Sequence, residues 1–309
     1  MTGELSVAMQ PGRSAISGLL RRLPEQLMIW VPLLLAAGHI VSFALWTIWI
    51  SFTPSTLVPV SGWVGLRNYT AVLATRNWQI AFNNLLLFGS TFVLLSLVTG
   101  LLLAILLDQR IRGENVLRSI FLYPLAVSFV VTGTVWSWLL NPGLGIEKLV
   151  HDLGWISFRF DWLIDRDMAI WTIVIAAVWQ SSGFAMALFL AGLRSVDNEL
   201  IKAAQIDGAG PVRMYRRVIL PTLWPITITV VVIQLQFAIS TFDLVRALTN
   251  GGPGIATQLP ALVVYDLMFQ RGLLGRGAAA AVLMLLILLA VLLPYAAWRF
   301  VKRRQAGHA

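Results

Sequence analysis

Long apolar stretches alternate with shorter polar segments along most of the chain. Six windows contain no Asp, Glu, Lys or Arg, and each can hold a helix of about 20 residues, which is the length that crosses the hydrocarbon core of a bilayer. The windows are 26–66, 77–107, 119–146, 168–193, 218–242 and 277–298. We therefore predict six membrane-spanning helices. They are placed near residues 27–50, 84–107, 119–140, 168–192, 222–242 and 279–300.

The composition supports a membrane protein and excludes a soluble one. Hydrophobic residues make up 58% of the 309-residue chain, charged residues make up 12%, and the mean hydropathy is +0.79. The net charge of +9 would suggest a nucleic-acid partner in a soluble protein, but basic residues beside membrane spans orient the chain instead. Cysteine is absent, so disulfides and thiolate chemistry are excluded. We predict an all-α, polytopic membrane protein with one domain.

The distribution of basic residues predicts the orientation of the spans. Six spans place both termini on the same side, and that side carries 15 Lys and Arg residues against 8 on the other. Because cytoplasmic loops are enriched in Lys and Arg, both termini are expected in the cytoplasm. The predicted organisation is a cytoplasmic leader with an amphipathic segment (1–26), a six-helix permease domain (27–301) and a cytoplasmic tail (302–309).

The polar segment 199–225 is the longest one in the second half of the chain, and it predicts two short helices. Asp197 or Asn198 can cap the first helix, and Gly208 can end it in the left-handed conformation. Pro211 then stands at the first position of a second helix.

Pro221 is expected to end this second helix. A helix–turn–helix with a small apolar face of its own requires a groove in a partner protein to cover it. The alternative is that this basic segment rests on anionic lipid headgroups.

The chain lacks the motifs of an enzyme or of a self-powered carrier. It has no GxxxxGK[ST] phosphate-binding loop and no HExxH motif, and His39, His151 and His308 are far apart in the sequence. The predicted span interiors contain no Asp, Glu, Lys or Arg, so a proton-coupled carrier is disfavoured. We expect no catalytic residues, no bound metal and no cofactor in this chain. ATP must then be handled by another subunit.

Uncharged polar and aromatic residues gather in the fourth and fifth predicted spans. Such amides, hydroxyls and rings suit a sugar, whose hydroxyls need hydrogen bonds and whose ring faces need flat apolar surfaces. Alternatively, they hydrogen-bond between helices, each contributing about 0.6 to 2 kcal/mol. By themselves the residues favour the packing role. The candidates are Trp179, Gln180, Ser181 and Phe184, and, on one face of the fifth span, Gln234, Phe237, Ala238 and Thr241.

Several segments resemble one transporter family. The run AAQIDG at 203–208, followed by LP at 220–221, is similar to the cytoplasmic EAA loop of binding-protein-dependent ABC transporter permeases. The segments GLRNY at 65–69, AGL at 191–193 and LTNGGP at 248–253 resemble the sugar-uptake branch, the maltose-permease type. The resemblance extends from about residue 30 to the end of the chain.

This resemblance implies a type I ABC importer permease fold in the cell inner membrane. It also implies four kinds of partner: a second homologous permease, two ATP-binding cassette ATPases that bind ATP and Mg, an extracytoplasmic solute-binding protein, and a sugar substrate. The coupling loop spans about 194–221. Its coupling residues are Lys202, Ala203, Ala204, Asp207, Gly208, Arg216, Leu220 and Pro221. The family usually has Glu where this chain has Lys202, so the contact with the ATPase differs here or is absent.

The same resemblance implies that these eight candidates match positions that contact sugar, which favours the cavity over the packing role. Ala177, Ala238 and Thr241 stand where the maltose-type relative has Asn, so the hydrogen-bonding pattern differs from that of a maltose site. Two alternatives remain open. One is a permease for glycerol-phosphate or a polyol-like cargo, although an anion favours an Arg or Lys that these spans lack. The other is a homo-oligomeric channel or facilitator without ATPase partners.

Overall fold

The computed structural model describes residues 13–109 and 112–306, and all regular structure within them is helical. The all-α prediction is therefore confirmed for this part of the chain. The long helices are α1 (Arg13–Ser51), α3 (Arg76–Leu107), α7 (Ala169–Arg194), α11 (Trp224–Ser240) and α14 (Leu274–Ala306). The shorter ones are α2 (Arg67–Leu73), α4 (Glu114–Ala126), α5 (Phe129–Leu139), α6 (Ile146–Asp152), α8 (Asn198–Ile206), α9 (Pro211–Met214), α10 (Leu220–Thr222), α12 (Asp243–Leu248) and α13 (Pro260–Tyr265). Two π-helical segments are η1 (Tyr215–Ile219) and η2 (Asp266–Gln270).

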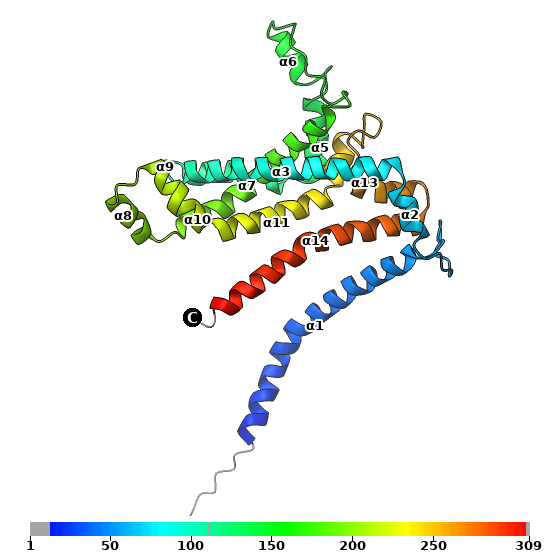
Figure 1. Cartoon of the computed structure of the whole chain (residues 1–309), viewed down its shortest axis with the longest axis horizontal. Coiled ribbons are helices and arrows are strands. Elements are labelled where there is room, and N and C mark those ends of the chain that lie inside the picture. The colour runs from blue at the N-terminus through cyan, green and yellow to red at the C-terminus, as the bar shows by residue number, and fades with distance from the viewer. Residues whose placement is uncertain (1–12, 110–111, 307–309) are drawn as a thin grey trace, which may run out of the picture.

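Helices α3, α7 and α11 lie side by side and form the centre of the bundle (Figure 1). Their shared core contains the fully buried side chains of Phe88, Ile173 and Ala238. Helices α3 and α7 approach very closely, since a Cβ added at Gly100 would lie 2.5 Å from the Cβ of Ala185. Small residues at such contacts allow membrane helices to pack backbone against backbone.

Among residues 13–109 and 112–306, the number of helices that are long and apolar enough to cross a membrane is between four and six. Residues 30–51 of α1, together with α3, α7 and α14, are each long and apolar enough. Two further candidates are bent pairs of helices. Helices α4 and α5 meet at 98°, and the segment Pro211–Thr222 meets α11 at 66°. The predicted six spans are reached when each bent pair counts as one.

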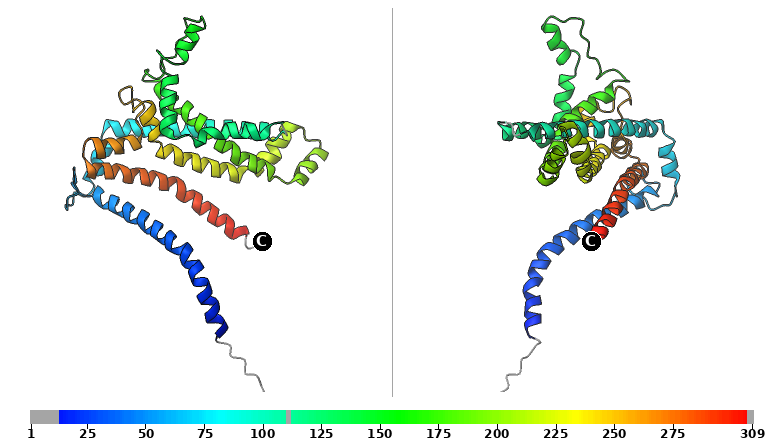
Figure 2. Two further views of the ribbon diagram at one scale, coloured as in Figure 1. Left: turned by 180° about the vertical axis from the view of Figure 1, so that it is seen from behind. Right: turned by 60° about the vertical axis from the view of Figure 1, so that its left-hand side comes forward.

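The third predicted span, 119–140, is not one continuous helix. Helix α4 ends at Ala126, Val127 is extended with ψ 137°, and α5 begins after Ser128. The Oγ of Ser128 accepts a hydrogen bond from the backbone N–H of Val131 at 3.3 Å, which caps the new helix. The prediction was wrong because hydropathy detects apolar length but not a cap inside it. Helix α5 consequently projects away from the bundle (Figures 1 and 2).

Pro221 does not end the second helix of the polar segment, contrary to expectation. The π-helical segment η1 precedes it, and the N–H of Leu220 bonds to the carbonyl of Tyr215, five residues back. Helical structure then continues through α10, and the 66° bend follows at Leu223, before α11. A proline lacks its own N–H and its ring crowds the carbonyl one turn before it, and a locally widened helix accommodates both effects.

Helix α1 leaves most of its apolar surface uncovered within the described part of the chain. It packs along α14 and diverges from the bundle toward its N-terminal end (Figure 2). Residues 30–50 are exposed or half-buried, and none of the 18 residues in the most apolar window of the helix is buried. An uncovered helix of this hydropathy requires lipid or another membrane subunit around it. The helix runs without a break across the predicted leader boundary at 26, whereas residues 1–12 and 307–309 lie outside the described part.

Candidate functional site

The clearest functional element is the elbow, which we define as residues 197–223. Its first helix, α8, is capped by Asp197, whose Oδ1 accepts a hydrogen bond from the N–H of Glu199 at 2.8 Å. Gly208 ends it with φ +73°, and the N–H of Ala209 bonds to the carbonyl of Ala204 at 2.9 Å. Pro211 occupies the start of α9. The predicted cap, stop and second start are therefore confirmed.

One side of the elbow is anchored in the bundle and the other side is open. Ile219 and Leu223 are buried in a cluster with Phe189 of α7 and Leu107 of α3. In contrast, the loop between α8 and α9 is flanked by Ile206, which is 86% exposed, and by Val212, which is 81% exposed. Such an element leaves apolar side chains free to dock on a partner. Because its other side is packed against α3 and α7, a movement of the element can be transmitted to these helices.

The predicted coupling residues lie on the accessible surface of this elbow. Lys202, Ala203, Asp207, Gly208, Arg216, Leu220 and Pro221 are exposed, and Ala204 is half-buried. Within residues 13–109 and 112–306, neither Lys202 nor Arg216 takes part in an ion pair. Both cations are therefore available to a partner's acidic groups.

A cluster of charges lies at the same end of the bundle and was not found from the sequence. Arg194 at the end of α7 pairs with Glu114 of α4 at 2.6 Å and with Asp108, which follows α3, at 3.8 Å. Arg118 approaches the same Glu114 carboxylate at 3.8 Å. The Arg194 side chain is 42% exposed, so these pairs contribute at most about 1 kcal/mol each. Their role is to hold the ends of three helices in a fixed arrangement. In the sequence, only the four-residue spacing of Glu114 and Arg118 indicates an ion pair.

Four of the eight predicted pathway residues are buried in the bundle: Gln180, Ser181, Gln234 and Ala238. The Nε2 of Gln180 donates to the carbonyl of Val127 at 2.7 Å, which satisfies the backbone at the break between α4 and α5. The hydroxyl of Ser181 donates to the carbonyl of Ala177 at 2.7 Å. These two side chains thus have structural partners in this chain.

Gln234 differs from them. Its side chain is fully buried, and neither its Oε1 nor its Nε2 has a hydrogen-bond partner among the described residues. A buried amide without partners destabilises the fold by about 1 to 3 kcal/mol. An orphaned amide inside a membrane bundle therefore points to a partner supplied from outside the chain, such as water, another subunit or a transported solute.

The remaining four residues lie in two different places. The rings of Phe184 and Phe237 meet edge to face at 6.3 Å, and Phe237 and Thr241 line a small pocket of about 40 Å³. Trp179 is 42% exposed and packs on Trp136, with ring centroids 5.9 Å apart.

These two tryptophans line two larger pockets among the described residues, of about 690 and 370 Å³, and the walls of these pockets are mostly apolar. The eight residues therefore do not surround one common cavity within this chain. Trp136 is an additional pocket residue that nothing in the sequence pattern distinguished from a membrane-facing side chain.

Known proteins provide an independent comparison. Residues 96–306 match the family described as "Binding-protein-dependent transport system inner membrane component". The "Probable ABC transporter permease protein" of Pyrococcus horikoshii is 38% identical over 281 residues, which cover 90% of this chain and 96% of that protein. The trehalose/maltose transport system permease protein MalF of Thermococcus litoralis is 32% identical, over 87% and 91% of the two chains. The sn-glycerol-3-phosphate transport system permease protein UgpA of Yersinia enterocolitica is 31% identical, over 89% and 95%.

Among solved structures, a chain of the bacterial alginate ABC transporter in complex with an alginate pentasaccharide-bound periplasmic protein superposes with a TM-score of 0.71. The match covers 88% of this chain and 95% of that one at 20% sequence identity, so it establishes a shared fold. The family match covers more than half of the chain and includes the elbow, α7, α11 and α14. The chain therefore belongs to the inner membrane components of binding-protein-dependent transport systems.

Proposed function

We propose that this chain is the permease subunit of an ATP-driven importer for a carbohydrate. The observation that carries the proposal is the elbow, which is anchored in the bundle through Ile219 and Leu223 and open at Ile206 and Val212. Together with the missing phosphate-binding loop, it indicates that an ATPase on another chain drives movement of α3 and α7 through packed contacts. Two such ATPases, a second permease and an extracytoplasmic binding protein complete the proposed assembly.

The proposed topology has six spans in the cell inner membrane. Both termini and the elbow lie on the cytoplasmic side. This topology counts α4 with α5 as one span, and α11 carries the fifth predicted span, 222–242, so that the elbow before it stays on the cytoplasmic side. The excess of Lys and Arg on the side of the termini supports this orientation. A cysteine-accessibility scan in intact cells checks it, because the native chain contains no cysteine that would interfere.

A carbohydrate is favoured as cargo by the chemistry of the pathway candidates. Gln234 and Thr241 offer neutral hydrogen-bonding groups, and Trp179, Phe184 and Phe237 offer ring faces. The relative from Thermococcus litoralis carries trehalose and maltose in its name, which supports the same class. Glycerol-phosphate is the second candidate, because the relative from Yersinia enterocolitica is named for it. A phosphate needs cationic partners, and the eight pathway candidates include none.

The decisive experiment purifies the chain from its native membrane and asks what accompanies it. We expect an ATPase to copurify, and we expect proteoliposomes with the complete assembly to accumulate sugar only when ATP and the binding protein are supplied. Solute movement by this chain alone at full rate would instead support a channel or facilitator. Stimulation of ATP hydrolysis by binding protein loaded with sugars, compared with glycerol-phosphate, then separates the two cargo classes.

Replacing Gln234 with leucine tests its place in the pathway. Because the amide has no partner in the described chain, an apolar side chain of similar size should leave the melting temperature unchanged or raise it. Uptake by the assembled transporter should fall by about tenfold, which corresponds to about 1.4 kcal/mol of lost interaction.

The matched control is Gln236→Leu, on the exposed side of the same helix, which should change neither property. A lower melting temperature with unchanged uptake would assign Gln234 to helix packing.

A further inference from the structure

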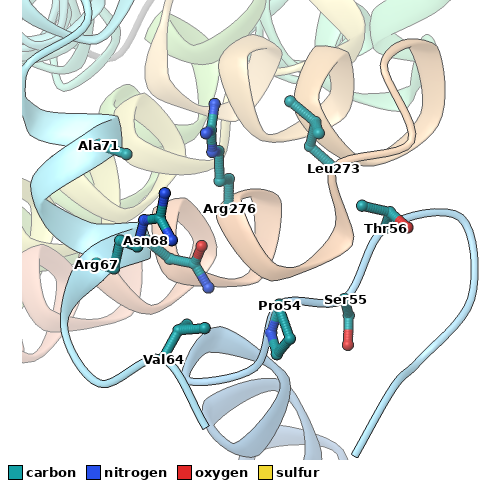
Figure 3. Close-up of a pocket in the computed structure, with 9 residues that line it drawn as sticks. All are labelled: Pro54, Ser55, Thr56, Val64, Arg67, Asn68, Ala71, Leu273 and Arg276. Atoms are coloured by element: carbon teal, nitrogen blue, oxygen red, sulfur yellow. The ribbon is translucent and has the colours of Figure 1, made fainter. Parts of the chain in front are cut away.

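Helix α2 and the start of α14 lie at the end of the bundle opposite the elbow (Figure 1), and a pocket of about 160 Å³ lies between them and the segment after α1 (Figure 3). Three parts of the chain form it: the segment after α1, the start of α2 and the start of α14. Its lining residues are Pro54, Ser55, Thr56, Val64, Arg67, Asn68, Ala71, Leu273 and Arg276. None of the proposed pathway or coupling residues belongs to it.

The floor of this pocket is held rigidly. The buried amide of Asn68 donates hydrogen bonds to the carbonyls of Ser51 and Thr53, at 2.9 and 2.8 Å. The N–H of Gly275 donates to the carbonyl of Ser55 at 2.8 Å, and a Cβ at Gly275 would lie only 2.4 Å from the Thr53 carbonyl oxygen. These bonds tie α1, α2 and α14 together around the pocket, so its shape is fixed before any ligand arrives.

Two arginines from different helices line the pocket. Arg67 is the first residue of α2, and Arg276 lies in the first turn of α14; both are exposed, and their guanidinium groups extend over the same side of it (Figure 3). No Asp or Glu lines the pocket, and neither arginine forms an ion pair within the described residues. Two unpaired guanidinium groups attract an anion, and the planar fork of arginine matches the oxygens of a phosphate.

The surroundings of the pocket are apolar in a way that indicates lipid. The loop that forms its rim exposes Leu57 to 82% and Trp63 to 67%. The last turns of α1, which lead into this loop, expose Trp46 and Trp49 to 54% and 50%. Tryptophans at the end of a membrane helix mark the interface where lipid headgroups lie. The two arginines therefore stand at the depth of lipid phosphates, beside an open apolar surface.

We propose that this pocket binds the headgroup phosphate of a phospholipid. Arg67 and Arg276 contact the phosphate oxygens, Thr56 at the rim offers a hydroxyl, and the acyl chains lie along the exposed face of α1. The lipid would thereby hold α1, which has little other cover in this chain, next to α14. The proposal depends on α1 and α14 being membrane helices and does not depend on which solute is transported.

The test compares lipid retention by the full-length protein and by Arg67→Gln/Arg276→Gln, using native mass spectrometry from detergent. Phosphatidylglycerol, phosphatidylethanolamine and phosphate-free diacylglycerol are added separately. We expect the native protein to keep both phospholipids and to lose diacylglycerol, and the double variant to bind phospholipid about tenfold more weakly. Inorganic phosphate is added as a competitor, to distinguish a headgroup site from a site for the free anion.

The control is Arg159→Gln/Arg271→Gln, which removes the same charge from two exposed arginines that do not line the pocket. It should retain phospholipid like the native protein, and melting temperatures should show that both double variants are folded. Equal retention by the pocket variant, or equal loss by the control, would overturn the proposal. Binding of inorganic phosphate as tight as that of phospholipid would also overturn it.

Discussion

Replacing Gly208 with valine is expected to uncouple the transporter while leaving its membrane bundle folded. Gly208 has φ +73°, and a β-branched residue in that conformation is strained by roughly 1 to 2 kcal/mol or more. A Cβ there would meet no atom within 4 Å, so the strain falls on the turn between α8 and α9 and not on the core. The turn would reorganise, and Ile206 and Val212 would no longer present one surface to a partner.

The measurement for this variant is ATP-dependent uptake together with ATPase copurification. We expect both to fall by on the order of tenfold or more, with an unchanged melting temperature of the isolated chain. The control is Gly210→Val in the same turn, where φ is −67° and a Cβ also meets nothing within 4 Å. It should retain most activity. Full uptake by the Gly208 variant would show that the elbow is not the coupling element.

Replacing Gly183 with alanine should prevent the bundle from forming correctly. A Cβ at this position of α7 would lie 1.9 Å from the carbonyl oxygen of Phe121 and 2.8 Å from its carbonyl carbon. Both are backbone atoms of α4, so no side-chain rotation can relieve the overlap. Overpacking of this kind destabilises the folded state by about 1 to 3 kcal/mol, and we expect a value at or above the upper end of this range here. It would also separate α4 from α7 and so break the hydrogen bond between Gln180 and Val127.

The expected readouts are a lower yield of monodisperse protein and a clearly lower melting temperature. Gly38→Ala is the matched control, because a Cβ there meets nothing within 4 Å and alanine is favoured over glycine inside a helix by about 1 kcal/mol. That variant should be neutral or slightly more stable. If Gly183→Ala behaved in the same way, the close approach of α4 and α7 would be incorrect.

Local features of the chain were predictable because their causes are local. Asp197 caps α8, Gly208 ends it and Pro211 starts α9, and each depends only on the backbone within a few residues. The apolar windows likewise anticipated α3, α7, α11 and α14, since length and hydropathy alone identify such helices. Family membership followed from short segments, of which the elbow sequence is the most specific.

Both errors arise because a lost backbone hydrogen bond is compensated in a way that a residue-by-residue reading of the sequence does not register. The third span breaks at Val127, where the amide of Gln180 satisfies the free carbonyl from a different helix. The helix continues past Pro221 because the π-helical turn before this residue is wider than an α-helical turn. In the first case, a side chain of another helix bonds the backbone carbonyl that the break leaves free. In the second case, the wider turn accommodates the missing N–H of the proline, so the helix continues.

The sequence by itself determined that the chain is a membrane protein that lacks a GxxxxGK[ST] phosphate-binding loop, and it determined where the elbow begins and turns. Hydropathy, charge and capping require no knowledge of what lies across the bundle. Only the tertiary structure decided that Gln234 is buried without a partner and that Trp179 faces a different pocket from Phe237. It also decided that Arg67 and Arg276 line one pocket. These relations join residues far apart in the chain, and helix packing sets which of them meet.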